Sequence, residues 1–212
     1  MAKINKGILG PLSGRVGPVI GFTWKGIPCI KGRTEKQTPP ATPAQIESRK
    51  KLSFLNNLLV PFHPYITVGF GQVAHQKTEI SAAFSRNYHA AVLGTYPDYV
   101  VAYDQFVIST GALPMVTDVA VELSNPDTIQ LTWKQNSAKH TSFDDQLILV
   151  IYCPELRRAD GFIGGVKRNA EQCTYVFNPN MIGKRLEIYL GMSSINRKHV
   201  AESIYLGSLP QV

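Results

Sequence analysis

The C-terminal half of the chain alternates hydrophobic and polar residues with a period of two. Residues 129–133 alternate, residues 147–152 are almost wholly apolar, and turn-forming residues such as Asn125, Pro126 and Asp127 separate these segments. Alternation predicts strands with one buried face, and the apolar run predicts a strand buried on both faces. We expect seven strands, at Asp118–Leu123, Thr128–Lys134, Gln146–Cys153, Gly161–Arg168, Gln172–Phe177, Arg185–Met192 and Val200–Leu206. Seven short strands in about 100 residues favour a β-sandwich.

Two upstream segments show the three- to four-residue spacing of a helix. The first follows the Pro-rich connector 38–43, where Thr42, Pro43 and Gln45 fit the N-cap, N1 and N3 positions of a capping box. We interpret its apolar stripe as the face that docks on the protein's own core. The alternative is that its uncharged end, residues 55–60, seats a partner helix.

The ends of these two helices are marked by proline and glycine. The segment Pro61–Pro64 is expected to break the first helix. The second helix is expected to run from about Thr78 to Leu93 and to end at Gly94.

Seven glycines punctuate the first 32 residues at intervals of three to six, which excludes a helix and favours short strands joined by tight turns. We expect a hairpin that pairs Val16–Trp24 with Ile27–Arg33 across a turn at Lys25 and Gly26. Phe22 and Trp24 then share one face of a strand. Packing in the protein core is the favoured interpretation of these two rings, and a stacking platform for bases is the alternative.

Part of the C-terminal half resembles a known domain. In a fibronectin type III domain, a Leu-x-Trp motif on the second strand packs under a tyrosine of a later strand. Leu131, Trp133 and Tyr189 occupy matching places here. Together with the hairpin and the two helices expected above, the resemblance gives an α+β chain in which a Gly-rich N-terminal β-hairpin and two helices precede a C-terminal seven-stranded fibronectin type III-like β-sandwich. The expected domains are a basic β/α region at 1–112 and the sandwich at 113–212.

A second resemblance spans most of the chain and rests on an ordered series of short motifs. The motifs are Met1–Ile4, Gly7–Gly10, Leu12–Gly17, Thr42–Gln45 with Arg49, and Gly111–Leu113. Together they are similar to an uncharacterised family of proteins of about 200 residues found mainly in Bacteroidota, a resemblance that carries no activity with it. The Gly-rich opening followed by Thr-Pro-x-Gln-x-x-x-Arg also resembles small proteins encoded in phage structural regions, which implies a role in an assembly.

Positive charge is concentrated at the N-terminus. The net charge of the chain is +7, and residues 1–60 hold ten basic side chains against two acidic ones. Such asymmetry indicates a contact with nucleic acid, an anionic membrane or an acidic protein face, although basic side chains also serve simply to solvate a surface. The candidate interaction residues are Lys25, Lys31, Arg33, Arg49, Lys50 and Lys51.

Residues suited to catalysis or metal binding are scattered. The histidines are His63, His75, His89, His140 and His199, and none has the helical spacing of a metal site. Asp144 and Asp145 form the only adjacent acidic pair, which we interpret as a turn with solvated charges. The three cysteines form no C-x-x-C pair and are expected to be free thiols. These patterns predict no enzyme, no cofactor, no metal and no small-molecule substrate.

The sequence thus predicts a non-enzymatic structural, assembly or protein-interaction protein that binds a protein partner or itself, as part of a phage-like or other large assembly. The alternative is a nucleic-acid-binding protein that uses the basic N-terminal region. Neither a signal-peptide core nor an apolar stretch of about 18 residues is visible in the sequence. We therefore expect a cytoplasmic protein, or one incorporated in a particle assembled there.

Overall fold

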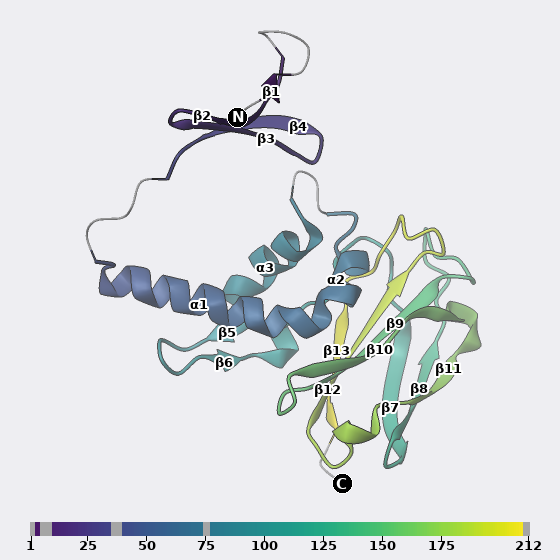
Figure 1. Cartoon of the computed structure of the whole chain (residues 1–212). Coiled ribbons are helices and arrows are strands. Elements are labelled where there is room, and N and C mark those ends of the chain that lie inside the picture. Colours follow the sequence, from purple (N-terminus) through teal and green to yellow (C-terminus); the bar gives the residue numbers. More distant parts are fainter. Residues whose placement is uncertain (1–2, 5–9, 35–39, 74–76, 210–212) are drawn as a thin grey trace. The chain divides into compact units, whose positions relative to one another are not determined.

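The computed structural model describes residues 3–4, 10–34, 40–73 and 77–209, and it divides the chain near the Pro-rich connector (Figure 1). Met1–Pro43 form one unit and Ala44–Val212 form the other. The division therefore falls at residues 43 and 44, whereas the sequence-based boundary at 112 and 113 lies inside the second unit. The physical reason is that the helices before residue 112 and the strands after it share one apolar core.

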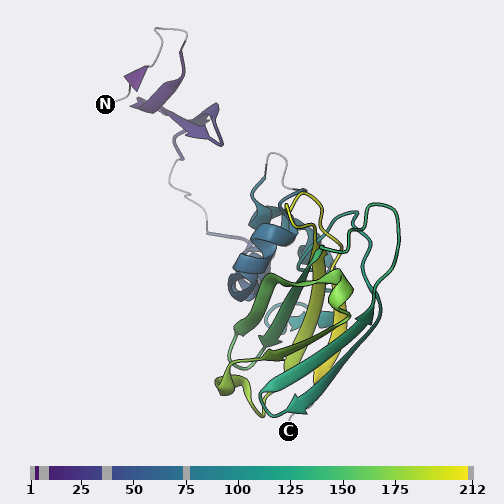
Figure 2. The ribbon, with the colours of Figure 1, turned by 90° about the vertical axis from the view of Figure 1, so that its right-hand side faces the viewer.

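The second unit contains two large antiparallel sheets besides one small two-stranded sheet. The strands of the two large sheets are β7 (Thr117–Asn125), β8 (Thr128–Lys134), β9 (Gln146–Cys153), β10 (Arg158–Lys167), β11 (Gln172–Val176), β12 (Leu186–Ser193) and β13 (Ile204–Leu209). One sheet has the order β10-β9-β12-β13 and the other the order β11-β8-β7. The sheets lie against each other (Figure 2) and share an apolar cluster. Each of the seven segments predicted to be strands overlaps one of these strands.

Strand β9 is buried on both faces. Its odd-numbered residues from 147 to 153 pack in the cluster between the two sheets, and its even-numbered residues from 148 to 152 pack against the helices. Strand β12 is buried along its whole length in the same way. A strand with two buried faces needs an apolar residue at nearly every position, which is the physical reason for the apolar run at 147–152.

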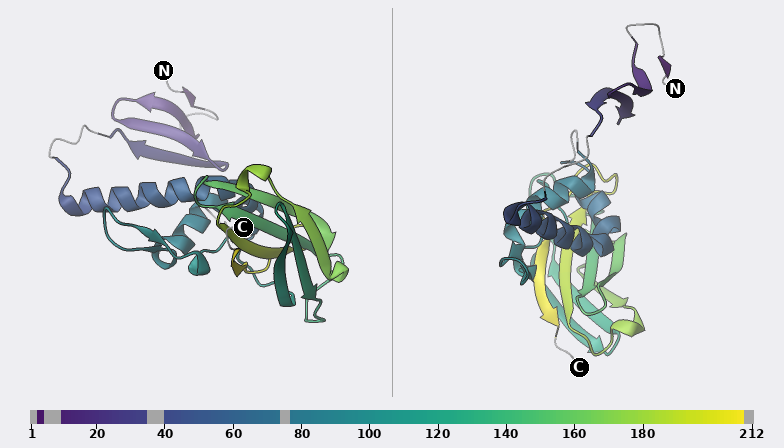
Figure 3. Two further views of the ribbon diagram at one scale, coloured as in Figure 1. Left: turned by 90° about the horizontal axis from the view of Figure 1, so that it is seen from below. Right: turned by 60° about the vertical axis from the view of Figure 1, so that its left-hand side comes forward.

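Three helices cover the outer face of the four-stranded sheet (Figure 3). They are α1 (Pro43–Leu59), α2 (His63–Gly69) and α3 (Glu79–Ala90), with a 3-10 turn at Val60–Phe62 between the first two. The predicted break of the first helix at Pro61–Pro64 is confirmed, because α1 ends at Leu59 and the chain continues as a 3-10 turn and a separate short helix. Each proline occupies one of the first two positions of its short helix, where no backbone N–H is needed.

The second predicted helix is shorter than expected at its C-terminal end. Thr78 is its N-cap, and the Thr78 hydroxyl oxygen accepts a hydrogen bond of 3.1 Å from the Ser81 backbone N–H. The helix ends at Ala90, and the next residues form β5 (Val92–Leu93), which pairs with β6 (Val100–Val101). The remaining short 3-10 segments are Tyr103–Gln105, Arg168–Ala170 and Pro179–Met181.

Tyr189 lies on the opposite side of its sheet from the place that the fibronectin resemblance implies. Leu131 and Trp133 are buried in the cluster between the two sheets, whereas Tyr189 is buried in the cluster under the helices. The Tyr189 hydroxyl donates a hydrogen bond of 2.9 Å to the Tyr103 carbonyl oxygen. The expected packing of Trp133 under Tyr189 is therefore wrong, because the alternation of β12 turns Ile188 toward Trp133 instead.

The N-terminal unit contains one antiparallel sheet with the order β1-β2-β3-β4. Its strands are β1 (Lys3–Ile4), β2 (Leu12–Val16), β3 (Val19–Trp24) and β4 (Ile27–Gly32). Strands β3 and β4 pair across Lys25 and Gly26, which both have positive φ, as a two-residue hairpin turn requires. The predicted single strand from Val16 to Trp24 is interrupted by a reversal at Gly17 and Pro18, where Gly17 has a φ of 55°.

Replacement of Phe62 tests whether the helical layer and the sheet form one core. Its ring is fully buried, with centroids 4.8 Å from Phe106 and 4.7 Å from Tyr152. Phe62→Ala should lower the free energy of unfolding by about 3–5 kcal/mol, because it leaves a cavity between the layers. Val60→Ala, at a neighbouring side chain that is 56% exposed, should change it by less than about 0.5 kcal/mol in the same urea titration. Equal effects of the two substitutions would contradict a shared core.

Candidate interaction surface

The apolar side chains of the N-terminal sheet are not gathered into a core. Val16 is 54% exposed, Trp24 38% and Ile30 71%. Among the described residues of the N-terminal unit, no second sheet packs on these strands. A sheet without a second layer leaves both of its faces available to other molecules.

Strand pairing assigns these side chains to two faces of different chemistry. Residues that lie directly opposite each other in an antiparallel pair share a face, and neighbours along a strand alternate. One face, which we name the basic-aromatic face, carries Arg15, Ile20, Phe22, Trp24, Ile27, Cys29 and Lys31. The opposite face, which we name the aliphatic face, carries Val16, Val19, Thr23, Pro28 and Ile30.

The two rings of the basic-aromatic face lie beside lysines. The Lys31 Nζ atom is 5.6 Å from the centroid of the Phe22 ring, and the Lys25 Nζ atom is 5.8 Å from the centroid of the Trp24 ring. Both distances are within the range of cation–π attraction. The interpretation that Phe22 and Trp24 pack in a core is therefore wrong, since the unit has no second layer in which to bury them.

The six candidate interaction residues fall into two groups. Lys25, Lys31 and Arg33 belong to the N-terminal unit, and Arg49, Lys50 and Lys51 lie on α1 in the other unit. Lys51 has a structural role, because its Nζ atom lies 4.8 Å from the centroid of the Tyr88 ring on α3. Arg15 completes the basic-aromatic face but was missed from the sequence, since its strand partner, Ile20, is set only by the turn at Gly17.

Strand β4 is an edge of the sheet that resists further pairing. A two-residue turn makes Trp24 and Ile27 a hydrogen-bonded pair, so the backbone groups of Pro28 and Ile30 point away from β3. The Arg33 backbone N–H donates to the Pro18 carbonyl oxygen at 2.6 Å, which fits the same alternation. Pro28 has no N–H to offer to another strand, and proline at such a position is a known protection of sheet edges. The faces of the sheet are thus better suited to binding than the edge of β4.

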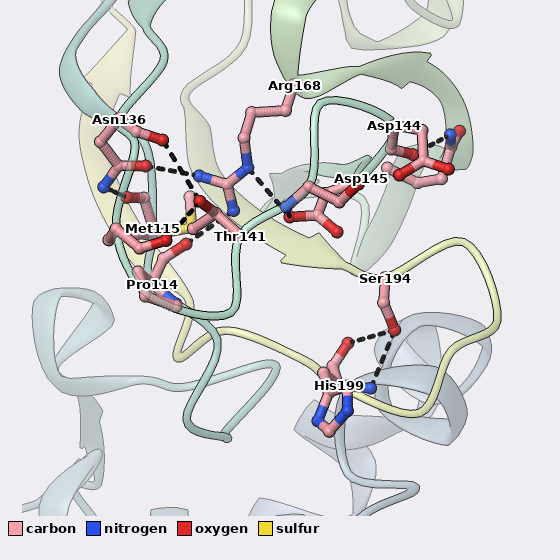
Figure 4. A network of polar contacts seen from close by, with 12 residues as sticks. Pro114, Met115, Asn136, Thr141, Asp144, Asp145, Arg168, Ser194 and His199 are labelled. Atoms are coloured by element: carbon pink, nitrogen blue, oxygen red, sulfur yellow. Dashed lines mark hydrogen bonds and ion pairs between the residues drawn. The ribbon is translucent and has the colours of Figure 1, made fainter.

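The adjacent acidic pair of the sequence does not form a solvated turn. Asp145 is buried, and its Oδ2 atom accepts a hydrogen bond of 3.0 Å from the Arg168 Nε atom (Figure 4). Arg168 also donates to the Asn136 side-chain oxygen and to the Pro114 carbonyl oxygen, both at 2.7 Å. The Trp133 indole N–H donates to the Arg168 carbonyl oxygen at 2.8 Å. The pair therefore ties a loop to the core, and only Asp144 is left partly exposed.

The contact between Ser194 and His199 is not a nucleophile–base pair. The Ser194 hydroxyl oxygen accepts from the His199 backbone N–H at 2.9 Å and lies 3.2 Å from the His199 carbonyl oxygen (Figure 4). The imidazole takes no part in these bonds. The contact closes a surface loop.

A second buried carboxylate is held in an ion pair. The Glu187 Oε1 atom lies 2.6 Å from the Arg185 Nε atom, and the Tyr205 hydroxyl donates to Glu187 Oε2 at 2.5 Å. Burial, together with the bond to Glu187, raises the pKa of Tyr205 to about 12. Glu187 is fully buried, whereas the Arg185 side chain is 54% exposed and Glu187 Oε1 accepts no hydrogen bond from the described residues.

The described residues include no cluster suited to metal binding. No three or more of their His, Cys, Asp and Glu side chains lie close enough together to hold a metal ion. His75 lies outside the described residues. Within the same residues, none of the helices has both the length and the apolar character to cross a membrane.

Substitution of Arg168 tests the role of the buried network. Arg168→Ala leaves Asp145 buried without its partner and should lower the free energy of unfolding by about 3–5 kcal/mol in a denaturant titration. Lys134→Ala removes an ion pair to Asp118 whose side chains are 73% and 64% exposed, so its effect should be small. The double variant Arg168→Ala with Asp145→Ala should cost less than the sum of the single variants. Additive costs would contradict direct coupling.

Comparison with known proteins gives a family match and similarities to solved structures. No curated protein matches the chain. Among solved structures, it is similar to the fn3 domain of the human collagen alpha-1(XX) chain, with 12% sequence identity and a TM-score of 0.36. That match covers 49% of this chain and 89% of the other. The model of a family described as "Family of unknown function (DUF6266)" matches residues 11–207, so the chain belongs to this family.

Proposed function

We propose that this chain is a non-enzymatic interaction protein that assembles with further copies of itself through the aliphatic face of its N-terminal sheet. One observation carries the proposal: Ile30 is 71% exposed and Val16 54% exposed on a sheet face that has no charged residue among its described members. Contiguous exposed apolar side chains mark interaction sites on most soluble proteins.

The energetics favour covering this face. A sheet of a few strands is marginal in water unless one of its faces is buried. Complete burial of one aliphatic side chain contributes about 1.5–3 kcal/mol, so Val16, Val19 and Ile30 together would offset much of the entropy that association costs. No charge has to be desolvated, because the cations of this sheet lie on the other face or in its turn.

A second copy of the chain is a suitable cover. β-Branched side chains on two facing sheets interdigitate at a separation of about 10 Å. A two-fold arrangement uses the same patch on both partners and therefore needs no further binding site.

The second unit would act as a rigid body in such an assembly. The three- and four-stranded sheets that share a core support the expectation of a seven-stranded, fibronectin type III-like sandwich. Modules of this architecture serve widely as spacers and adhesion units, which suits a component of a phage-like or other large assembly. A non-enzymatic role is supported by the ion pairs that hold the two buried carboxylates, Asp145 and Glu187.

Self-association can be tested with the full-length chain. Sedimentation velocity over a wide concentration range should show a reversible increase in mass, and Ile30→Gln should shift the equilibrium toward the monomer by about tenfold or more in dissociation constant. The reason is that each copy would bury a polar amide in place of the isoleucine side chain.

The matched control is Ile195→Gln, because Ile195 is 61% exposed in the other unit. This substitution should leave the dissociation constant unchanged. A wild-type chain that remains monomeric at all concentrations, or an equal effect of the two substitutions, would refute self-association through this face.

A further inference from the structure

The basic-aromatic face presents positive charge on strands whose described residues include no aspartate or glutamate. The first acidic residue of the chain is Glu35, and six basic residues precede it. Arg15 and Lys31 share a face with Phe22 and Trp24, and Lys25 stands in the adjoining turn. A surface of this kind attracts a polyanion, and its exposed rings add a feature that charge alone does not explain.

We propose that the basic-aromatic face binds single-stranded nucleic acid, with bases stacked on Trp24 and Phe22 and phosphates near Arg15, Lys25 and Lys31. The two rings are two residues apart on one strand, about 7 Å, which leaves room for one base on each. Aromatic residues on the open face of a small antiparallel sheet are a recognised platform for unstacked bases.

The lysines that now lie beside the rings do not prevent stacking. An exposed cation–π contact is weaker than the stacking of one base on an aromatic ring. A base can therefore displace the ammonium group from the Trp24 or Phe22 ring. The released Lys25 or Lys31 side chain stays within reach of the phosphate beside that base. Its ammonium group can therefore form an ion pair with that phosphate.

The chemistry favours nucleic acid over an anionic membrane. A lipid surface offers phosphates but no planar base. It would bind the cations through its phosphates and contact the rings only as apolar surface, without stacking on them. Duplex DNA also fits less well, because its bases are stacked on one another and unavailable to Trp24. Nucleic-acid binding does not require self-association, since the aliphatic face lies on the other side of the sheet.

The first part of the test measures how much the basic side chains contribute to binding. Fluorescence anisotropy of a labelled oligo-dT of about 15 nucleotides with the full-length chain should give an affinity that falls log-linearly with salt. Lys25→Gln and Lys31→Gln should each reduce the magnitude of the salt slope by about 0.7, because each removes one phosphate contact to a single strand. Lys139→Gln, an exposed lysine of the other unit, changes the net charge equally and should leave the slope unchanged.

The second part of the test measures whether bases stack on Trp24. Trp24→Ser should weaken oligo-dT binding by roughly tenfold or more, and Trp24→Tyr should retain most of the affinity, since tyrosine still offers a ring. Trp133 is buried, so quenching of the exposed Trp24 fluorescence upon binding reports the same contact. At protein concentrations low enough for both chains to be monomeric, Ile30→Gln should bind oligo-dT with the affinity of the wild type, which separates this test from that of self-association.

Three results would overturn the proposal. The first is no binding at about 50 mM salt, where phosphate contacts are strong. The second is unchanged affinity of Trp24→Ser, which would indicate charge attraction alone. The third is equal or tighter binding to vesicles containing phosphatidylserine, with the same dependence on Trp24, which would identify a membrane surface as the partner.

Discussion

The burial of one sheet on both sides is the constraint on which the larger unit depends. Strands β9 and β12 stand between the three-stranded sheet and the helices, so each residue along them faces apolar neighbours. Hydrophobic burial on two sides stabilises the sheet more than a single layer would, and it fixes the register, because a slip by one residue would exchange the two sets of side chains. The same constraint explains why polar groups in this region, such as Glu187 and Arg168, are found in ion pairs.

The N-terminal sheet lacks this constraint, and its properties follow from the difference. Because the sheet has no second layer, its apolar residues are exposed. Lys25 and Lys31 pack over the exposed rings of Trp24 and Phe22. The edge at β4 is blunted by Pro28, so the two faces are what the sheet offers to other molecules. Their chemistry is unlike, with Ile30 and Val16 on one side and Trp24 and Lys31 on the other, which is why we assign them different partners.

The sequence predicts local structure well where periodicity and turn residues agree, and less well where contacts between distant segments decide. The apolar run at 147–152 predicts a strand buried on both faces, and the structure places it there. The side of the sheet that Tyr189 faces could not be predicted, because it depends on the helices that supply a second core. Asp145 could not be distinguished from a solvated residue, since its partner, Arg168, lies 23 residues away. The exposure of Trp24 could not be predicted either. An aromatic residue in an alternating strand is usually buried by a second layer, which this unit does not supply.

The two faces of the N-terminal sheet are coupled by electrostatics. Self-association through the aliphatic face would bring two cationic sheets together at a separation of about 10 Å, which is near the Debye length at 0.1 M salt, so their repulsion would be only partly screened. A polyanion on the basic-aromatic faces removes that repulsion, and by linkage association must then strengthen nucleic-acid binding by the same factor. Two outward-facing sites on one particle would also engage a long strand together, which raises the effective affinity without any new contact. High salt would weaken the nucleic-acid contact but favour association of the sheets, so the balance between the two activities depends on ionic strength.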